Sequence, residues 1–166
     1  MSITAERLRE VLHYDPDTGI FTWIKNTGYK RMAGKVAGKV SSHGYISIGI
    51  DRLNLYAHRL AFLYMTGKIP KEIDHIDTIR HNNKWANLRE ATRTFNNANR
   101  TASKIRKLPK GVTQVQSKGK KLNRYFARIH LNDKCYYLGC FSSPEEAAMM
   151  YQSAASGFFG PFMRAK

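Results

Sequence analysis

The chain has 166 residues, and 28 Lys and Arg residues against 12 Asp and Glu residues give it a formal net charge of +16 at pH 7. This length fits one ordinary domain or two small ones and excludes a large multidomain enzyme. A composition with 42% hydrophobic and 11% aromatic residues is too rich in core-forming side chains for a disordered basic tail. We therefore expect a folded protein whose partner is a polyanion.

Membrane and zinc proteins are disfavoured by the same composition. The longest uninterrupted apolar run, residues 60–65, is far shorter than the stretch of about 18 residues that crosses a bilayer, and the N-terminal segment lacks a signal pattern. Only two cysteines occur, Cys135 and Cys140, which excludes a disulfide framework and a four-ligand structural zinc site. We expect both cysteines to be reduced packing residues in a cytoplasmic protein without a membrane partner.

The first part of the chain predicts short helices and antiparallel hairpins. Thr4 is expected to cap the first helix, and the turn signal DPDTG precedes the first clear strand. Gly67 and Pro70 are expected to end the second helix. The patterned segments are, in chain order, a helix over 4–12, strands over 20–24 and 45–50, and a helix over 55–65.

The next segment predicts a strand, a polar loop and a helix. Residues 72–77, EIDHID, alternate as in a strand, and residues 78–85 are a polar turn. Residues 86–100 keep an apolar face at helical spacing, formed by Leu88, Ala91, Phe95 and Ala98.

A change of pattern near residue 101 predicts a domain boundary. Residues 101–110 hold four Lys or Arg residues and no apolar period, which indicates a basic linker. Three short alternating segments follow, over 111–115, 124–131 and 134–141, and predict an antiparallel meander. A helix that begins after Ser143 should cover this sheet with Ala147, Met150, Tyr151 and Ala154. The expected fold class is α+β, with domains at 1–100 and 111–166.

Four polar residues in the middle of the chain suit phosphodiester hydrolysis. Such a reaction needs a base to activate water and a hard cation to neutralise charge on the phosphorane and the departing oxygen. His75, with an ordinary pKa of about 6.5, suits the base. Asp74, together with the amide oxygen of Asn96, suits Mg²⁺, which often takes only one or two protein ligands. Asn87 lies at the entrance of the predicted helix.

This ordered series, in DHIDTIRHNNKWANLREATRTFNNANR, resembles the HNH nucleases, whose core is the ββα-metal finger. The resemblance implies that His75 is the general base, that Asp74 and Asn96 hold one Mg²⁺ or Mn²⁺, and that Asn87 braces the loop between two strands. It places the finger at about residues 44–100 and implies 5′-phosphate and 3′-hydroxyl products. One departure is Thr78-Ile79, where relatives usually have a glycine-containing turn.

The text from residue 5 to residue 100 also looks like phage-encoded homing endonucleases. The segments that carry this resemblance are HYDPDTGIFTW, AGKVAG, GYISI and AHRLAFLYMTGKIPKEIDHID. The resemblance implies an enzyme that cuts double-stranded DNA of a related genome at a specific site inside a bacterial host cell. We expect a monomer or a weak dimer.

The C-terminal block resembles the APETALA2-type DNA-binding domain, in which a three-stranded sheet enters the major groove and a helix backs it. The matching segments are GV, YFARI, YLGCF, SPEEAAMMY and GPFMR. From their chemistry, four residues are expected to contact DNA, namely Arg124, Arg128, Lys134 and Tyr136. Alternation puts Arg124, Phe126 and Arg128 on the face opposite the helix, where Phe126 either stacks on DNA or indicates a wrong register.

Several alternatives stay open from the sequence alone. Asn97 is a rival for the metal position of Asn96, and Asn82 and Asn83 suit turn formation. His58 suits packing or a phosphate contact better than a second catalytic base. At the level of the whole protein, the alternatives are a non-cleaving, sequence-specific DNA-binding regulator and a nuclease directed at RNA or at particular nucleic-acid structures.

Overall fold

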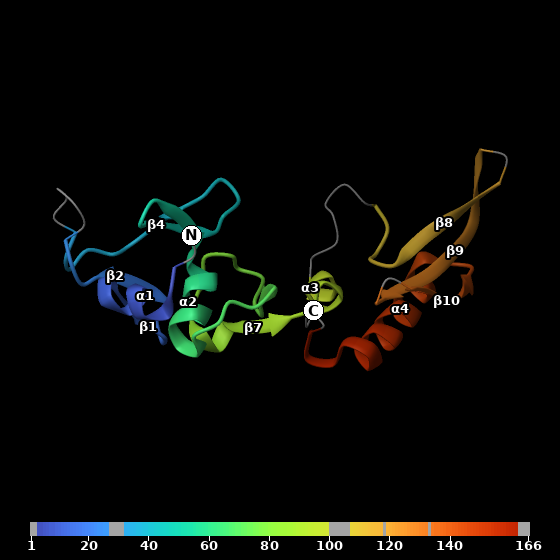
Figure 1. Cartoon of the computed structure of the whole chain (residues 1–166). Coiled ribbons are helices and arrows are strands. Elements are labelled where there is room, and N and C mark those ends of the chain that lie inside the picture. Colours follow the sequence, from blue (N-terminus) through green and yellow to red (C-terminus); the bar gives the residue numbers. More distant parts are fainter. Residues whose placement is uncertain (1–2, 27–31, 100–106, 118, 133, 163–166) are drawn as a thin grey trace. The chain divides into compact units, whose positions relative to one another are not determined.

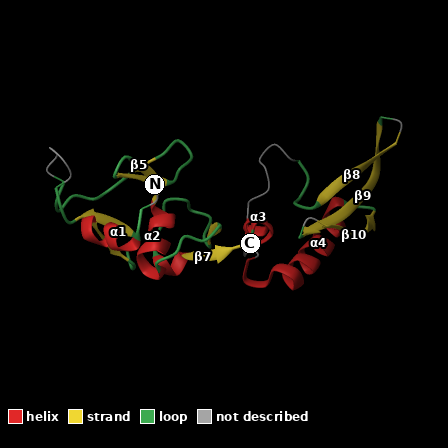
Figure 2. Cartoon of the chain, viewed as in Figure 1, coloured by secondary structure: helices red, strands yellow, loops and turns green. Residues whose placement is uncertain are grey.

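The computed structural model describes residues 3–26, 32–99, 107–117, 119–132 and 134–162. The chain forms two compact units, Met1–Thr92 and Arg93–Lys166, each built from helices and small antiparallel sheets, as the sequence predicts for an α+β protein (Figures 1 and 2). The division falls before the helix that carries Asn96. The expected basic linker, residues 101–110, lies outside the described residues as far as residue 106.

The described residues of the first unit form two helices, one short 3₁₀ helix and three small sheets. Its strands pair in the orders β1-β2, β3-β4-β5 and β6-β7, and every pair is antiparallel. The elements are α1 (Ala5–Val11), β1 (Leu12–Asp15), β2 (Ile20–Trp23), β3 (Lys39–Val40), β4 (Ile46–Ile50), β5 (Leu53–Tyr56), α2 (Ala57–Thr66), β6 (Glu72–His75), η1 (Trp85–Asn87) and β7 (Leu88–Ala91).

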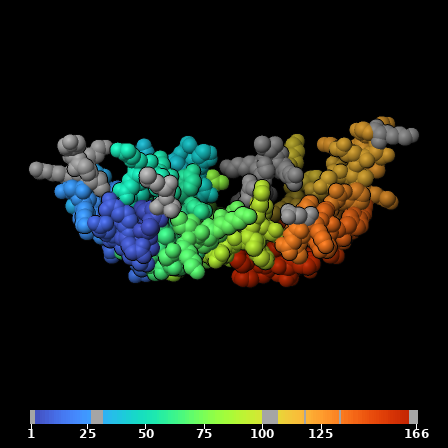
Figure 3. Space-filling view, in the orientation of Figure 1, coloured from blue at the N-terminus to red at the C-terminus, as the bar shows by residue number. Residues whose placement is uncertain are grey.

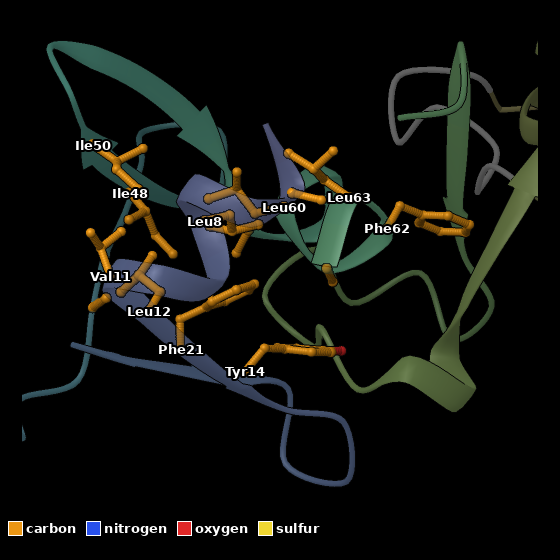
Figure 4. Packing of buried hydrophobic residues seen from close by; sticks show 14 of the residues in the cluster. Leu8, Val11, Leu12, Tyr14, Phe21, Ile48, Ile50, Leu60, Phe62 and Leu63 are labelled. Carbon is orange, nitrogen blue, oxygen red and sulfur yellow. The ribbon is translucent and has the colours of Figure 1, made fainter. Parts of the chain in front are cut away.

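The core of the first unit joins α1, α2 and the β1-β2 hairpin. The Thr4 side chain accepts a hydrogen bond from the Arg7 backbone amide, which confirms the predicted N-cap. Leu8 and Leu60 are fully buried within one hydrophobic cluster, and Phe21 lies beside Tyr14 with ring centroids 4.7 Å apart (Figure 4). Because α1 and α2 pack on the same cluster, they hold the hairpin in place.

The second helix begins two residues later than its pattern predicts. Residues 53–56 form β5, which pairs with β4, so α2 starts at Ala57. It ends as predicted at Gly67, whose φ of 73° is the left-handed conformation that glycine adopts without steric cost.

The predicted helix over residues 86–100 is wrong in its first part. Leu88–Ala91 is a strand, β7, which pairs with β6 in the register Asp74↔Arg89 and His75↔Leu88. The helix α3 spans only Arg93–Asn99. The LREA segment consists of good helix formers, but pairing with β6 outweighs this intrinsic preference. Asn87 accordingly ends the short helix η1 and does not open α3.

The second unit contains the predicted meander and its covering helix. β8 (Val112–Ser117), β9 (Lys120–Leu131) and β10 (Lys134–Phe141) form a sheet of order β10-β9-β8, and α4 (Pro144–Phe159) lies along one face of it (Figure 1). A 3₁₀ helix, η2 (Gly160–Phe162), follows. The far ends of β8 and β9 stand out from the body of this unit (Figure 3).

Helix α4 starts as its sequence predicts, but its buried face differs in part. The Ser143 side chain accepts from the Glu146 amide, and Ala147 and Tyr151 are buried against the sheet. Met150 is exposed, and Ala155 is buried in place of the predicted Ala154. The hydrophobic cluster of α4 also contains Ala98 of α3, with Phe95 packed against it.

The cysteines were wrongly expected to be packing residues, since Cys135 and Cys140 are both exposed free thiols. They lie opposite His130 and Phe126 of β9, on the side of the sheet away from α4. Among the described residues, none of the helices has the length and apolar character that a membrane crossing requires.

Candidate functional site

The β6-β7 hairpin carries the candidate active site in the first unit. Asp74 and His75 are the last two residues of β6, and both are buried. Adjacent residues of a strand point to opposite faces, so the carboxylate and the imidazole leave the strand in opposite directions. The structure therefore places the predicted acid and base side by side in the chain, at the end of a hairpin.

The His75 imidazole is enclosed by polar and aromatic side chains. Its Nε2 lies 3.3 Å from Oδ1 of Asn83, and its ring centroid is 5.9 Å from that of Tyr45 and 5.1 Å from that of His58. Burial lowers the pKa of His75, although the hydrogen bond with Asn83 and the nearby carboxylate of Asp77 act in the opposite direction. The imidazole is thus neutral at pH 7 and has a lone pair that can accept a proton.

His58 is the second buried imidazole of this site. It lies on α2, stacks on Tyr56 with ring centroids 5.6 Å apart and is 8% exposed. Burial lowers its pKa to about 3, and the nearby charges of His75 and Arg59 act in the same direction. Its Nδ1 is buried and has no hydrogen-bond partner among the described residues. His58 therefore packs beside the candidate base, which agrees with the packing role predicted for it. A neutral, buried imidazole does not suit the alternative, a phosphate contact by a charged side chain.

The loop between β6 and β7 is held by Asn87. Its Nδ2 donates to Oδ1 of Asp77 at 3.0 Å and to the backbone oxygen of Asn82 at 2.8 Å, and its Oδ1 accepts from the Asp77 amide at 3.0 Å. Burial would raise the pKa of Asp77, but donation from Asn82, Ile79 and Asn87 lowers it below its ordinary value. These are the contacts of a residue that braces a loop, the role that the family resemblance implies for Asn87.

Thr78 adopts an unusual backbone conformation in this loop. Its φ is 65°, in the left-handed region, which a β-branched residue rarely enters. This is the place where the sequence departs from the glycine-containing turn of similar nucleases. The loop keeps the turn that glycine would favour, and the hydrogen bond from the Thr78 amide to the His75 carbonyl, 2.9 Å, is made within it.

Asp74 has a charged partner that sequence reasoning missed. Arg89 lies opposite it in the hairpin register and donates to Asp74 Oδ2 from Nε at 2.9 Å and from Nη2 at 2.7 Å. The two side chains are 5% and 16% exposed, so this is a largely buried ion pair. The sequence could have predicted this pair as opposite charges facing each other across two strands. That prediction requires residues 88–91 to be recognised as a strand.

The predicted metal ligands do not all belong to one unit. Asp74 is in the first unit, whereas Asn96 and its rival Asn97 are in α3, within the second. Across the described residues there is no group of three His, Cys, Asp or Glu side chains that is able to hold a metal ion. One carboxylate with one amide would not form such a group, and these oxygen donors fit a hard cation such as Mg²⁺.

The candidate DNA-contacting residues of the second unit divide between the two faces of the sheet. Arg124, Phe126 and Arg128 alternate with Ala127 and Ile129, which are buried, so the predicted register of β9 is confirmed. The Arg128 guanidinium carbon lies 5.2 Å from the centroid of the Phe126 ring.

Lys134 and Tyr136 lie on the other face. They are opposite Leu131 and Ile129, and directly opposed residues of an antiparallel pair point to the same side, toward α4. Tyr136 stacks on Phe158 of α4, with ring centroids 6.2 Å apart. The structure therefore does not bring these two residues together with Arg124 and Arg128.

Tyr137 is a surface residue of this sheet that sequence reasoning missed. It is opposite Arg128, 60% exposed, and forms an edge contact with Phe126 at 5.5 Å between ring centroids. Tyr136 and Tyr137 are neighbours in β10 and pair with Ile129 and Arg128, so only Tyr137 shares the face of Arg128.

Comparisons with known proteins agree with the chemistry of the β6-β7 hairpin. The model of an HNH endonuclease family matches residues 55–98, which include α2 and the hairpin. The chain is 33% identical over 144 residues to an uncharacterised HNH endonuclease of Acanthamoeba polyphaga mimivirus, and the match covers 84% of this chain and 68% of that protein. No solved structure matches this chain. Because this match covers more than two thirds of both proteins at 33% identity, the chain belongs to the HNH endonuclease family.

Proposed function

We propose that this endonuclease hydrolyses double-stranded DNA with His75 as the general base. The observation that carries the proposal is the end of β6, where a buried, neutral imidazole follows a buried carboxylate in a hairpin whose loop Asn87 braces. Since burial keeps the pKa of His75 below its ordinary value, the imidazole is ready to accept a proton at neutral pH.

In the proposed reaction, His75 removes a proton from a water molecule as the water oxygen forms a bond to phosphorus. The bond between phosphorus and the 3′ oxygen breaks on the opposite side, and the departing oxygen takes a proton from solvent. The products are a 5′-phosphate and a 3′-hydroxyl.

We assign the binding of one Mg²⁺ or Mn²⁺ to Asp74 and Asn96, with Asn97 as the rival for the amide ligand. A divalent cation, when bound, supplies positive charge next to the scissile phosphate and the departing oxygen. The support is the family resemblance and the donor chemistry, since a carboxylate, here buried and oriented by Arg89, and an amide oxygen are the kinds of ligand that a hard divalent cation prefers.

The second unit is proposed to bind the DNA duplex through the face of the sheet opposite α4. Arg124 and Arg128 supply positive charge there, and Phe126 and Tyr137 supply aromatic surface beside Arg128. Arginine can contact both phosphates and base edges, which makes this face suitable for a sequence reader. Lys134 and Tyr136 belong to the α4 side and are expected to contribute less.

The biological setting that we propose is phage homing, in which the enzyme cuts a related genome at a specific site so that repair copies its gene. The support is the resemblance of residues 5–100 to phage homing endonucleases. Sequencing the ends of fragments cut from host and viral genomes tests this proposal, because a homing enzyme yields one or a few sites with a fixed stagger.

Plasmid relaxation tests the nuclease proposal. The wild-type protein should convert supercoiled DNA with Mg²⁺ or Mn²⁺ and not with EDTA, while His75→Ala and Asp74→Ala should bind the plasmid without cleaving it. The matched control is His13→Ala, which changes an exposed histidine of β1 and should leave cleavage intact. Binding without cleavage by the wild-type protein under every divalent metal would favour the DNA-binding regulator instead.

A further inference from the structure

Asn83 is an almost completely buried residue of the β6-β7 loop that contacts the candidate base. It is 2% exposed, and its Oδ1 lies 3.3 Å from Nε2 of His75. Its Nδ2 donates to the backbone oxygen of His81 at 3.2 Å. An Asn amide has a donor end and an acceptor end, and reversing it would set Oδ1 against the His81 carbonyl, where two acceptors would repel each other. The loop therefore fixes which end of the Asn83 amide faces the imidazole.

This orientation determines the protonation of the neutral imidazole. Oδ1 is only an acceptor, so the hydrogen bond forms when Nε2 of His75 carries the hydrogen, and the lone pair is then on Nδ1. On the basis of the proposed function, we infer that Asn83 is a positioning residue that holds His75 in the Nε2–H tautomer, with Nδ1 as the atom that accepts the proton from water.

The N-terminal hairpin holds Asn83 in turn. The buried hydroxyl of Tyr14, on β1, donates to the Asn83 backbone oxygen at 2.7 Å. In the close view of the core, Tyr14 carries its hydroxyl at the edge of the hydrophobic cluster (Figure 4). The Trp85 amide donates to the Pro16 backbone oxygen at 2.9 Å. The turn between β1 and β2 therefore lies directly against the chain at residues 83–85.

Gly19 shows how close this approach is. A Cβ at Gly19 would lie 2.4 Å from the Asn83 carbonyl carbon and from the Lys84 nitrogen, and its φ is 75°. Only glycine fits both the conformation and the space. The turn DPDTG, which lies far from His75 in sequence, is thus part of the structure that orients the base.

The imidazole ¹⁵N chemical shifts of His75 test the inference without DNA or metal. At pH 8 the wild-type protein should show a protonated Nε2 and an unprotonated Nδ1. Asn83→Leu, which keeps the size of the side chain and removes the acceptor, should populate both tautomers. The control Asn54→Leu changes an exposed asparagine of β5 and should leave the pattern unchanged.

Kinetics provide the second measurement. Asn83→Leu should lower kcat about 10–100-fold, the usual effect of losing a group that orients a ligand or base, with KM for plasmid DNA unchanged. Tyr14→Phe, which removes the donor to the Asn83 backbone, should lower kcat by less than Asn83→Leu and again leave KM unchanged.

The outcomes separate this inference from the proposed function. A wild-type His75 protonated on Nδ1, or an Asn83→Leu variant with wild-type shifts and kcat, would overturn the role of Asn83 while leaving DNA cleavage by His75 intact. If instead the wild-type protein fails to cleave DNA, the proposed function fails, and the ¹⁵N shifts still decide whether Asn83 fixes the tautomer.

Discussion

Protonation of His58 should couple the stability of the first unit to pH. Burial lowers the pKa of this imidazole from 6.5 to about 3. The unfolded chain therefore binds a proton below pH 6.5 that the folded chain does not bind, so the free energy of unfolding falls as pH falls from 6.5 toward 3. Substitution of His58 by Gln or Phe removes this titration.

The expected size of the effect follows from the two pKa values. Between them, each pH unit changes the free energy of unfolding by about 1.4 kcal/mol, so at pH 5 the loss from His58 is about 2 kcal/mol. Phe should also remove the buried Nδ1 that lacks a hydrogen-bond partner among the described residues while keeping a ring to stack on Tyr56. We therefore expect His58→Phe to lose about 2 kcal/mol less stability than the wild type between pH 7 and pH 5.

Tryptophan fluorescence during urea unfolding measures this difference in the first unit, which contains His58. Both tryptophans, Trp23 and Trp85, belong to the first unit, so their signal reports its unfolding. The comparison needs wild type, His58→Phe, His58→Gln and the exposed control His13→Gln at pH 7 and pH 5. The reasoning is refuted if both His58 variants lose as much stability on acidification as the wild type and the control.

Three further predictions concern the hairpin, its loop and the sheet. Arg89→Met should destabilise the first unit by about 3–5 kcal/mol in urea unfolding, because it removes the positive charge that pairs with the buried Asp74 carboxylate, and adding Asp74→Asn should recover most of the loss. Thr78→Gly should stabilise the same unit by about 1 kcal/mol by relieving the left-handed backbone; an unchanged urea midpoint would count against strain there. In DNA-binding titrations with EDTA at several salt concentrations, Arg128→Ala should reduce the slope of log K against log salt by about 1, and Lys134→Ala should change it less; the reverse order would place the DNA on the α4 side.

Local pattern was sufficient for much of the fold. Thr4 caps α1, Gly67 ends α2, and the meander with its covering helix lies where alternation and the Ser143 cap predict it. These features depend on residues close in sequence, so a sequence window contains the interactions that produce them. The same holds for the adjacency of Asp74 and His75 on one strand.

The main errors arose where a distant segment decides the outcome. Residues 88–91 read as helix because their side chains favour helix, yet they pair with β6. Tyr136 faces α4 because its pairing with the buried Ile129 of β9 fixes its side of the sheet. The exposure of Cys135 and Cys140 follows from the same register.

The sequence by itself determined the strong positive charge, the order of acid, base and amides that marks an HNH endonuclease, and the α+β class. Only the tertiary structure decided how the candidate base is held: Asn83 beside His75, Arg89 on Asp74, and the turn at Gly19 against the loop between β6 and β7. The physical reason is that residue type sets which hydrogen bonds a side chain is able to make. Packing between segments far apart in the chain selects the ones that it does make.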